Sequence, residues 1–273
     1  MKALRVFKGL VAFLTAIPLD ACMQIDEDFL GISARFMFLF PLIGALIGFL
    51  VGLYALLLNH LLSFLFGVLN ATFFSGSQET LFFYLTRAIS SVMVLSFLLV
   101  LIGLQHTDGL VDVGNAIGIR KASVEERMEI AHAWIVTRTG VLLALLVAFC
   151  TLLLIFLAGP ETIIRFFVVA EISAKLAMVT CAWQGTSIKR GKGSIFVDSM
   201  KRRHSLYLIS LAISLFVGAT LLGVNGVLAV SLGMAVGGVF IVFSKRIFGG
   251  MTGDIFGATN EIVRMIALFV LVL

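Results

Sequence analysis

The sequence predicts an all-α fold, a polytopic bundle of transmembrane helices, from its composition and from the length of its apolar runs. Of the 273 residues, 60% are hydrophobic and 13% are charged, and the mean hydropathy is +1.13. Soluble domains are about half apolar and about one quarter charged. The apolar runs reach the roughly 20 residues that a helix needs to cross a hydrocarbon core about 30 Å thick. We therefore expect a single integral-membrane domain, residues 1–273, with about seven spans.

The elements are expected in order along the chain, beginning with an N-terminal interfacial helix. Lys2, Arg5 and Lys8 stand beside apolar residues such as Phe7 and Leu10, a pattern typical of a helix lying on the membrane surface. Membrane lipid is therefore an expected partner. The spans that follow are expected at residues 36–58, 84–104, 140–159, 163–183, 206–224, 226–244 and 256–273.

The first span carries a ladder of small residues. Gly44, Gly48 and Gly52 are spaced by four, so one face of the helix is smooth enough for a second helix to pack closely. The ladder predicts a packing face, and together with the apolar surfaces it is compatible with a homo-oligomer.

The positions of the basic residues predict how the helices are oriented. Sixteen of the 20 Lys and Arg residues precede the first span, lie between spans two and three or four and five, or follow span six. These segments share one side of the membrane if the spans alternate. By the positive-inside rule, the N-terminus and the polar loops are cytoplasmic, the C-terminus is outside, and the expected location is the cell membrane. The net charge of +5 thus reflects orientation, and no nucleic-acid partner is expected.

The first polar cluster on the cytoplasmic side is "HTDGLVDVGNAIG". In a helix, Asp108, Asp112 and Asn115 share one face, and His106 lies just before them. Two carboxylates this close repel each other unless a cation lies between them. Oxygen ligands of this kind suit Mg²⁺. The alternative is a solvated loop whose acids only follow the membrane exit.

A second acidic cluster, "GGMTGDIFGATNEI", lies near the C-terminus. Asp254 and Glu261 are two helical turns apart on one face, and Thr252 and Asn260 are polar neighbours that are candidates for substrate binding. The glycines of this segment allow a close approach of backbone to a ligand and can present N–H groups to an anion.

We hypothesise that Asp108 and Asp112 hold Mg²⁺ and that Asp254 and Glu261 complete the site. The alternative roles are a helix cap for Asp254 and helix packing for Gly257.

A basic, glycine-rich segment supplies the third candidate element. In "SIKRGKGSIFVDSMKRRH", Lys189, Arg190 and Lys192 lie beside glycines and are candidates for binding a phosphate or a nucleotide tail. The positive-inside signal alone, or contact with anionic lipid headgroups, would also account for these cations.

The two acidic motifs, together with "FLTAIPL" and "FPLIGALIG" near the N-terminus, resemble in order the motifs of the adenosylcobinamide-GDP ribazoletransferase family. The run from His106 to Asp112 matches the H-x-D-G-x-x-D signature of that family. The resemblance implies a polytopic, Mg²⁺-dependent transferase of late cobalamin biosynthesis. Its substrates would be adenosylcobinamide-GDP and α-ribazole or α-ribazole 5′-phosphate, and it would release GMP.

The motif match also implies roles for individual residues. Asp108, Asp112, Asp254 and Glu261 would handle the metal and the pyrophosphate, with His106 beside them as a further catalytic candidate. The chain departs from the family at two places. Asn115 stands where the family usually has Asp, and the later stretch "HAWIVTRTG" lacks the Asp that is usual there.

Two other functions compete with this interpretation. A CDP-alcohol phosphotransferase needs the pattern D-x-x-D-G-x-x-A-R, but here Gln105 occupies the first Asp position and no Ala-Arg follows Gly109. A multi-span transporter predicts ionisable groups near mid-membrane, and only Glu171, Lys175 and Arg264 fit that expectation. The acids instead gather at one face, which favours an enzyme.

Overall fold

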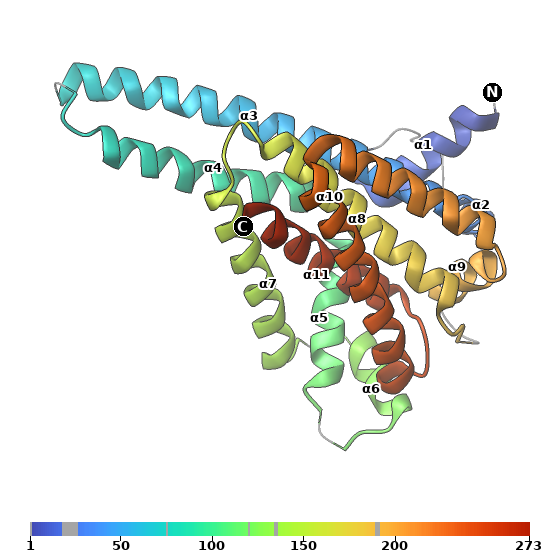
Figure 1. The fold of residues 1–273 in the computed structure, drawn as a ribbon. Helices are drawn as coiled ribbons and strands as arrows, with labels where there is room; N and C mark the ends of the chain where they lie inside the picture. The colour runs from blue at the N-terminus through green and yellow to red at the C-terminus, as the bar shows by residue number, and fades with distance from the viewer. Residues whose placement is uncertain (1, 18–26, 75, 120, 134–135, 189–191) are drawn as a thin grey trace.

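The computed structural model describes residues 2–17, 27–74, 76–119, 121–133, 136–188 and 192–273. Over these residues the regular structure is helical and contains no β-strand, which confirms the all-α prediction (Figure 1). The helices are α1 (Lys2–Leu14), α2 (Glu27–Arg35), η1 (Met37–Leu39), α3 (Phe40–Phe73), α4 (Glu79–Leu101), α5 (Gln105–Ile117), α6 (Val124–His132), α7 (Arg138–Leu157), α8 (Ile163–Gln184), α9 (Lys192–Met200), α10 (His204–Phe248) and α11 (Gly253–Val272).

Five helices in the described part of the chain are long and apolar enough to cross a membrane, namely α3 with η1, α4, α7, α10 and α11. Helix α10 is bent at Gly223, whose φ of 58° and ψ of −132° are not helical, and its two arms run in different directions (Figure 1). It therefore contains both predicted spans 206–224 and 226–244. Helix α8 covers the predicted span 163–183 but is not among the five. The number of about seven spans and their orientation stay predictions.

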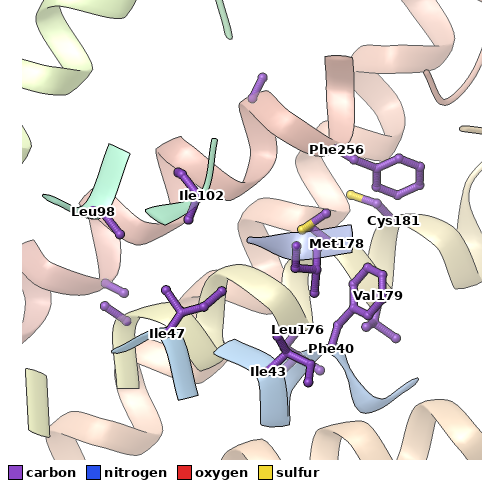
Figure 2. Close-up of a cluster of buried hydrophobic side chains, with 14 of the residues drawn as sticks. Phe40, Ile43, Ile47, Leu98, Ile102, Leu176, Met178, Val179, Cys181 and Phe256 are labelled. Carbon is purple, nitrogen blue, oxygen red and sulfur yellow. The ribbon is translucent and has the colours of Figure 1, made fainter. Parts of the chain in front are cut away.

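Helix α8 forms the centre of the bundle, and the glycine ladder of α3 packs against it. Every α8 residue from Phe167 to Ala182 is buried. A Cβ added to Gly44 would lie 2.6 Å from the carbonyl oxygen of Glu171, and one added to Gly48 would collide with the backbone of Phe167. Only glycine permits so close an approach, so the predicted packing face is confirmed. Figure 2 shows the resulting apolar core between side chains of α3, α4, α8 and α11.

Helix α3 is longer than the span predicted for it. It continues past residue 58 to Phe73, and its 34 residues make it about 51 Å long, against a hydrocarbon core of about 30 Å. The added segment contains no proline and only one glycine, so nothing in its sequence ends the helix. Figure 1 shows the α3–α4 hairpin projecting beyond the other helices, and apolar side chains on it, such as Phe64 and Phe73, are exposed.

Candidate active site

A tight turn between α4 and α5 places the first acidic motif. Gly103 (φ 69°) and Leu104 (φ 60°) both have left-handed backbone, and their N–H groups donate to Val100 O and Leu99 O at 3.1 Å each. These bonds close the end of α4, as in glycine-capped helix ends. Helix α5 begins immediately afterwards. His106 and Asp108 therefore lie in the first turn of α5, where the helix dipole favours a negative charge.

The second acidic motif begins α11 in a similar way. Gly249 (φ 73°) ends α10, and Met251 N donates to Thr186 O at 2.9 Å, which ties the start of α11 to the segment after α8. The hydroxyl of Thr252 caps α11 by accepting from Ile255 N at 3.2 Å. Thr252 is buried in this capping position and is not a cavity-lining residue. Asp254 follows in the first turn of α11.

Glycines bring the two motifs together. A Cβ on Gly109 of α5 would lie 2.8 Å from both Cα and O of Asp254, and one on Gly257 would lie 3.0 Å from the carbonyl oxygen of His106. Helix α9 packs closely against the start of α11, because a Cβ on Gly193 would lie 2.7 Å from the carbonyl carbon of Thr252. Real Cβ atoms are essentially never found closer than 3.0 Å to another atom, so the contacts at Gly109 and Gly193 depend on glycine, and the one at Gly257 is nearly as tight.

A cavity of about 280 Å³ opens at this junction and has two walls of different character. The polar wall carries the side chains of the two acidic motifs together with the backbone of four glycines: Gln105, His106, Asp108, Gly109, Gly193, Gly253, Asp254 and Gly257. The apolar wall comes from seven helical elements: Phe13, Leu14, Leu30, Met37, Phe40, Met178, Phe196 and Phe256. Asp108 and Asp254, 146 positions apart in the sequence, thus face one cavity.

His106 is held in the polar wall with one ring nitrogen that has no partner among the described residues. Its side chain is buried, and Nδ1 has no hydrogen-bond partner among the described residues. Burial lowers the pKa of His106 well below its usual range, and the charges of Lys175 and Arg264 lower this pKa further. The imidazole is therefore neutral near pH 7.

Glu261 and Asn260 lie deeper, in a buried charge network with Glu171, Lys175 and Arg264. Arg264 Nη1 donates to Glu261 Oε2 at 2.7 Å, and Arg264 Nε donates to Glu171. Lys175 Nζ donates to Asn260 Oδ1 at 2.6 Å and lies 3.7 Å from Glu171 Oε2. Two carboxylates thus compensate two cations away from water. Neither Asn260 nor Glu261 lines the cavity.

The remaining predicted site residues lie at several places. Asn115 is buried, and its Oδ1 accepts from Thr137 N at 2.9 Å and from Thr137 Oγ1 at 2.8 Å, which fixes the entry to α7. Asp112 is half-buried one turn after Asp108 and does not line the cavity. Lys189 and Arg190 lie outside the described residues. The backbone of Lys192 begins α9, and its side chain is likewise outside the description.

The four carboxylates predicted to hold Mg²⁺ therefore do not all meet at the cavity. Within the described residues there is no group of three or more His, Cys, Asp or Glu side chains arranged to hold a metal ion. Two carboxylates, Asp108 and Asp254, face the cavity. This donor set suits Mg²⁺, which takes one or two protein carboxylates and completes its shell with water and substrate phosphates.

The apolar wall was not predicted from the sequence. Phe13, Phe40, Phe196 and Phe256 come from four separate helices, and each stands in an apolar run that reads as ordinary core. The one available signal was the high phenylalanine count of 25, which carries no positional information.

Comparisons with known proteins agree with one another over nearly the whole chain. A family described as cobalamin-5-phosphate synthase matches residues 6–272. The adenosylcobinamide-GDP ribazoletransferase of Syntrophobacter fumaroxidans is 30% identical over 272 residues, which cover 96% of each chain. The protein of the same name from Methanocella arvoryzae is 28% identical over 280 residues, which cover 97% of this chain and 94% of the relative. No solved structure matches the chain.

Proposed function

The chain belongs to the cobalamin-5-phosphate synthase family, and we propose that it joins α-ribazole or its 5′-phosphate to adenosylcobinamide-GDP. It is a transferase of cobalamin biosynthesis. In the proposed reaction, a ribose hydroxyl oxygen forms a bond to the phosphorus attached to cobinamide. The bond from that phosphorus to the bridging oxygen breaks, and GMP leaves. The observation that carries the proposal is the shared cavity of Asp108 and Asp254.

We further propose that the reaction depends on Mg²⁺ held by Asp108 and Asp254. Two carboxylates on one cavity would repel a pyrophosphate unless a cation lay between them. When bound, Mg²⁺ neutralises the charge of the pyrophosphate and of the departing GMP. Asp112 remains a candidate ligand from the next turn of α5. Glu261 accepts a hydrogen bond from Arg264, and we therefore assign it a structural role beneath the site.

Residues of the polar wall serve the remaining chemical needs in this proposal. His106 is the candidate acceptor for the proton of the attacking hydroxyl, because it lines the cavity and its ring is neutral. The first turn of α11, at Gly253 and Asp254, presents the positive end of a helix dipole to the phosphates. The cations Lys189, Arg190 and Lys192 stay candidates for binding the guanosine phosphates.

The proposal is tested by the release of GMP from purified protein in detergent. Adenosylcobinamide-GDP is supplied with α-ribazole or with its 5′-phosphate, with and without Mg²⁺, and the corrinoid product is identified by its mass. We expect GMP only when Mg²⁺ and a nucleoside are both present. The Asp254→Asn variant should lose about 100-fold or more in kcat, while Glu129→Gln, an exposed carboxylate on α6, should match the wild type. Folded protein that releases no GMP with either nucleoside would contradict the proposal.

A further inference from the structure

We propose that the apolar wall of the cavity is the subsite for the flat aromatic base of the nucleoside substrate, an assignment that rests on the proposed function. The central feature is a phenylalanine cluster made of Phe13, Phe40, Phe196 and Phe256. Phe196 lies at its centre, with ring centroids 5.4 Å from Phe13, 6.1 Å from Phe40 and 6.1 Å from Phe256. Phe13 and Phe40 are 6.2 Å apart.

The cluster differs from the rest of the apolar core because it borders open space. Protein interiors are close-packed, with few voids larger than a water molecule, and unfilled space beside apolar side chains destabilises the fold. Figure 2 shows the neighbouring core, and Ile43, Ile47 and Leu176 in it are fully buried. A cavity of about 280 Å³ next to that packing indicates room kept for a ligand.

The size of the cavity selects between the two substrates. Ligand pockets usually measure about 300–1,000 Å³, so this cavity of about 280 Å³ lies just below the usual range. It suits a nucleoside, whereas a corrin macrocycle with its attached GDP is several times larger. The corrinoid must therefore remain outside the cavity and extend only its pyrophosphate towards Asp108 and Asp254.

The distribution of polarity orients the nucleoside within the cavity. Its base is flat and aromatic and matches the phenylalanine rings, while its ribose carries hydroxyl groups and matches the polar wall. With the base on Phe196, the ribose is directed towards His106 and the two carboxylates. This orientation brings the attacking hydroxyl to the side of the cavity where the pyrophosphate is expected.

Substitution of the central ring tests the assignment. In Phe196→Leu, the apolar volume is largely kept but the ring face is lost, and we expect the KM for α-ribazole to rise roughly 10-fold. The KM for adenosylcobinamide-GDP and the kcat at saturation should stay within about twofold of wild type, because the corrinoid lies outside the cavity. Phe13→Leu, at a half-buried position, should act in the same direction. Phe240→Leu is the matched control, since this buried ring lies on α10 and pairs with Phe243 away from the cavity.

Two further measurements keep the outcomes separate. The wild-type release of GMP is established first, so that a wild type without activity refutes the proposed function and not the subsite alone. Ribosides with flat aromatic bases should compete with α-ribazole, whereas ribose 5-phosphate should not. An active protein in which Phe196→Leu and Phe13→Leu leave the α-ribazole KM unchanged, or raise only the corrinoid KM, would overturn the subsite. Melting temperatures of the variants in detergent confirm that each one is folded.

Discussion

Replacing Gly109 with alanine tests whether the close contact between α5 and α11 is needed for activity. The added Cβ would lie 2.8 Å from Cα and from O of Asp254, and ordinary van der Waals contact begins at 3.4 Å. The backbones must therefore separate by 3.4 less 2.8, or about 0.6 Å, because neither contacted atom belongs to a flexible side chain. Overpacking of this kind typically costs about 1–3 kcal/mol of stability.

The separation of the two backbones also changes the position of the Asp108 carboxylate relative to that of Asp254. A misplacement of about 1 Å can cost roughly 100-fold in rate, so we expect kcat for GMP release to fall about 10- to 100-fold in Gly109→Ala. The control is Gly238→Ala on α10, where a Cβ meets no atom within 4 Å, and this variant should keep the wild-type kcat. A wild-type kcat in folded Gly109→Ala would refute the idea that Asp108 and Asp254 act together across this contact.

Further substitutions probe the supports around the site. Arg264→Leu leaves Glu171 and Glu261 buried without their shared cation. The free energy of unfolding in detergent, measured with denaturant, should therefore fall by about 3–5 kcal/mol. Gly48→Val should lower the melting temperature strongly, because a Cβ there collides with the backbone of α8; an unchanged melting temperature would contradict the close packing of α3 on α8. Ser123→Ala removes half of the capping box of α6 and should destabilise that helix by about 1 kcal/mol, visible as faster amide exchange in α6 alone.

Much of the fold could be predicted because its causes are local in the sequence. The composition and the length of the apolar runs led directly to an all-α membrane protein. The spacing of Gly44, Gly48 and Gly52 predicted a packing face, since side chains four apart in a helix share one surface. The capping box of α6 is equally local, since Ser123 and Glu126 are three residues apart, and both of its hydrogen bonds are present, at 2.7 and 3.2 Å.

The parts of the site that were not predicted depend on contacts between distant segments. Helical periodicity placed Asn115 on the face of Asp108, but its bond to Thr137 belongs to the loop before α7. Glu261 was grouped with Asp254 by spacing, yet its partner Arg264 lies one turn further along α11, and the sequence alone gives no sign that Glu171 of α8 shares that cation. Motif spacing therefore grouped the four acids without resolving which of them face the cavity.

The lengths of two helices explain why the polar chemistry lies at an edge of the bundle. Helix α5 has 13 residues and is about 20 Å long, which is too short to cross a hydrocarbon core of about 30 Å. Helix α11 has 20 residues and is long enough to cross, and it meets α5 near its own first turn, at Asp254. Asp108 and Asp254 both stand in first turns, so both carboxylates lie at the positive ends of helix dipoles. We infer that the start of a short helix packed against the start of a long one is what sets two acids beside an apolar cavity while keeping them within reach of water.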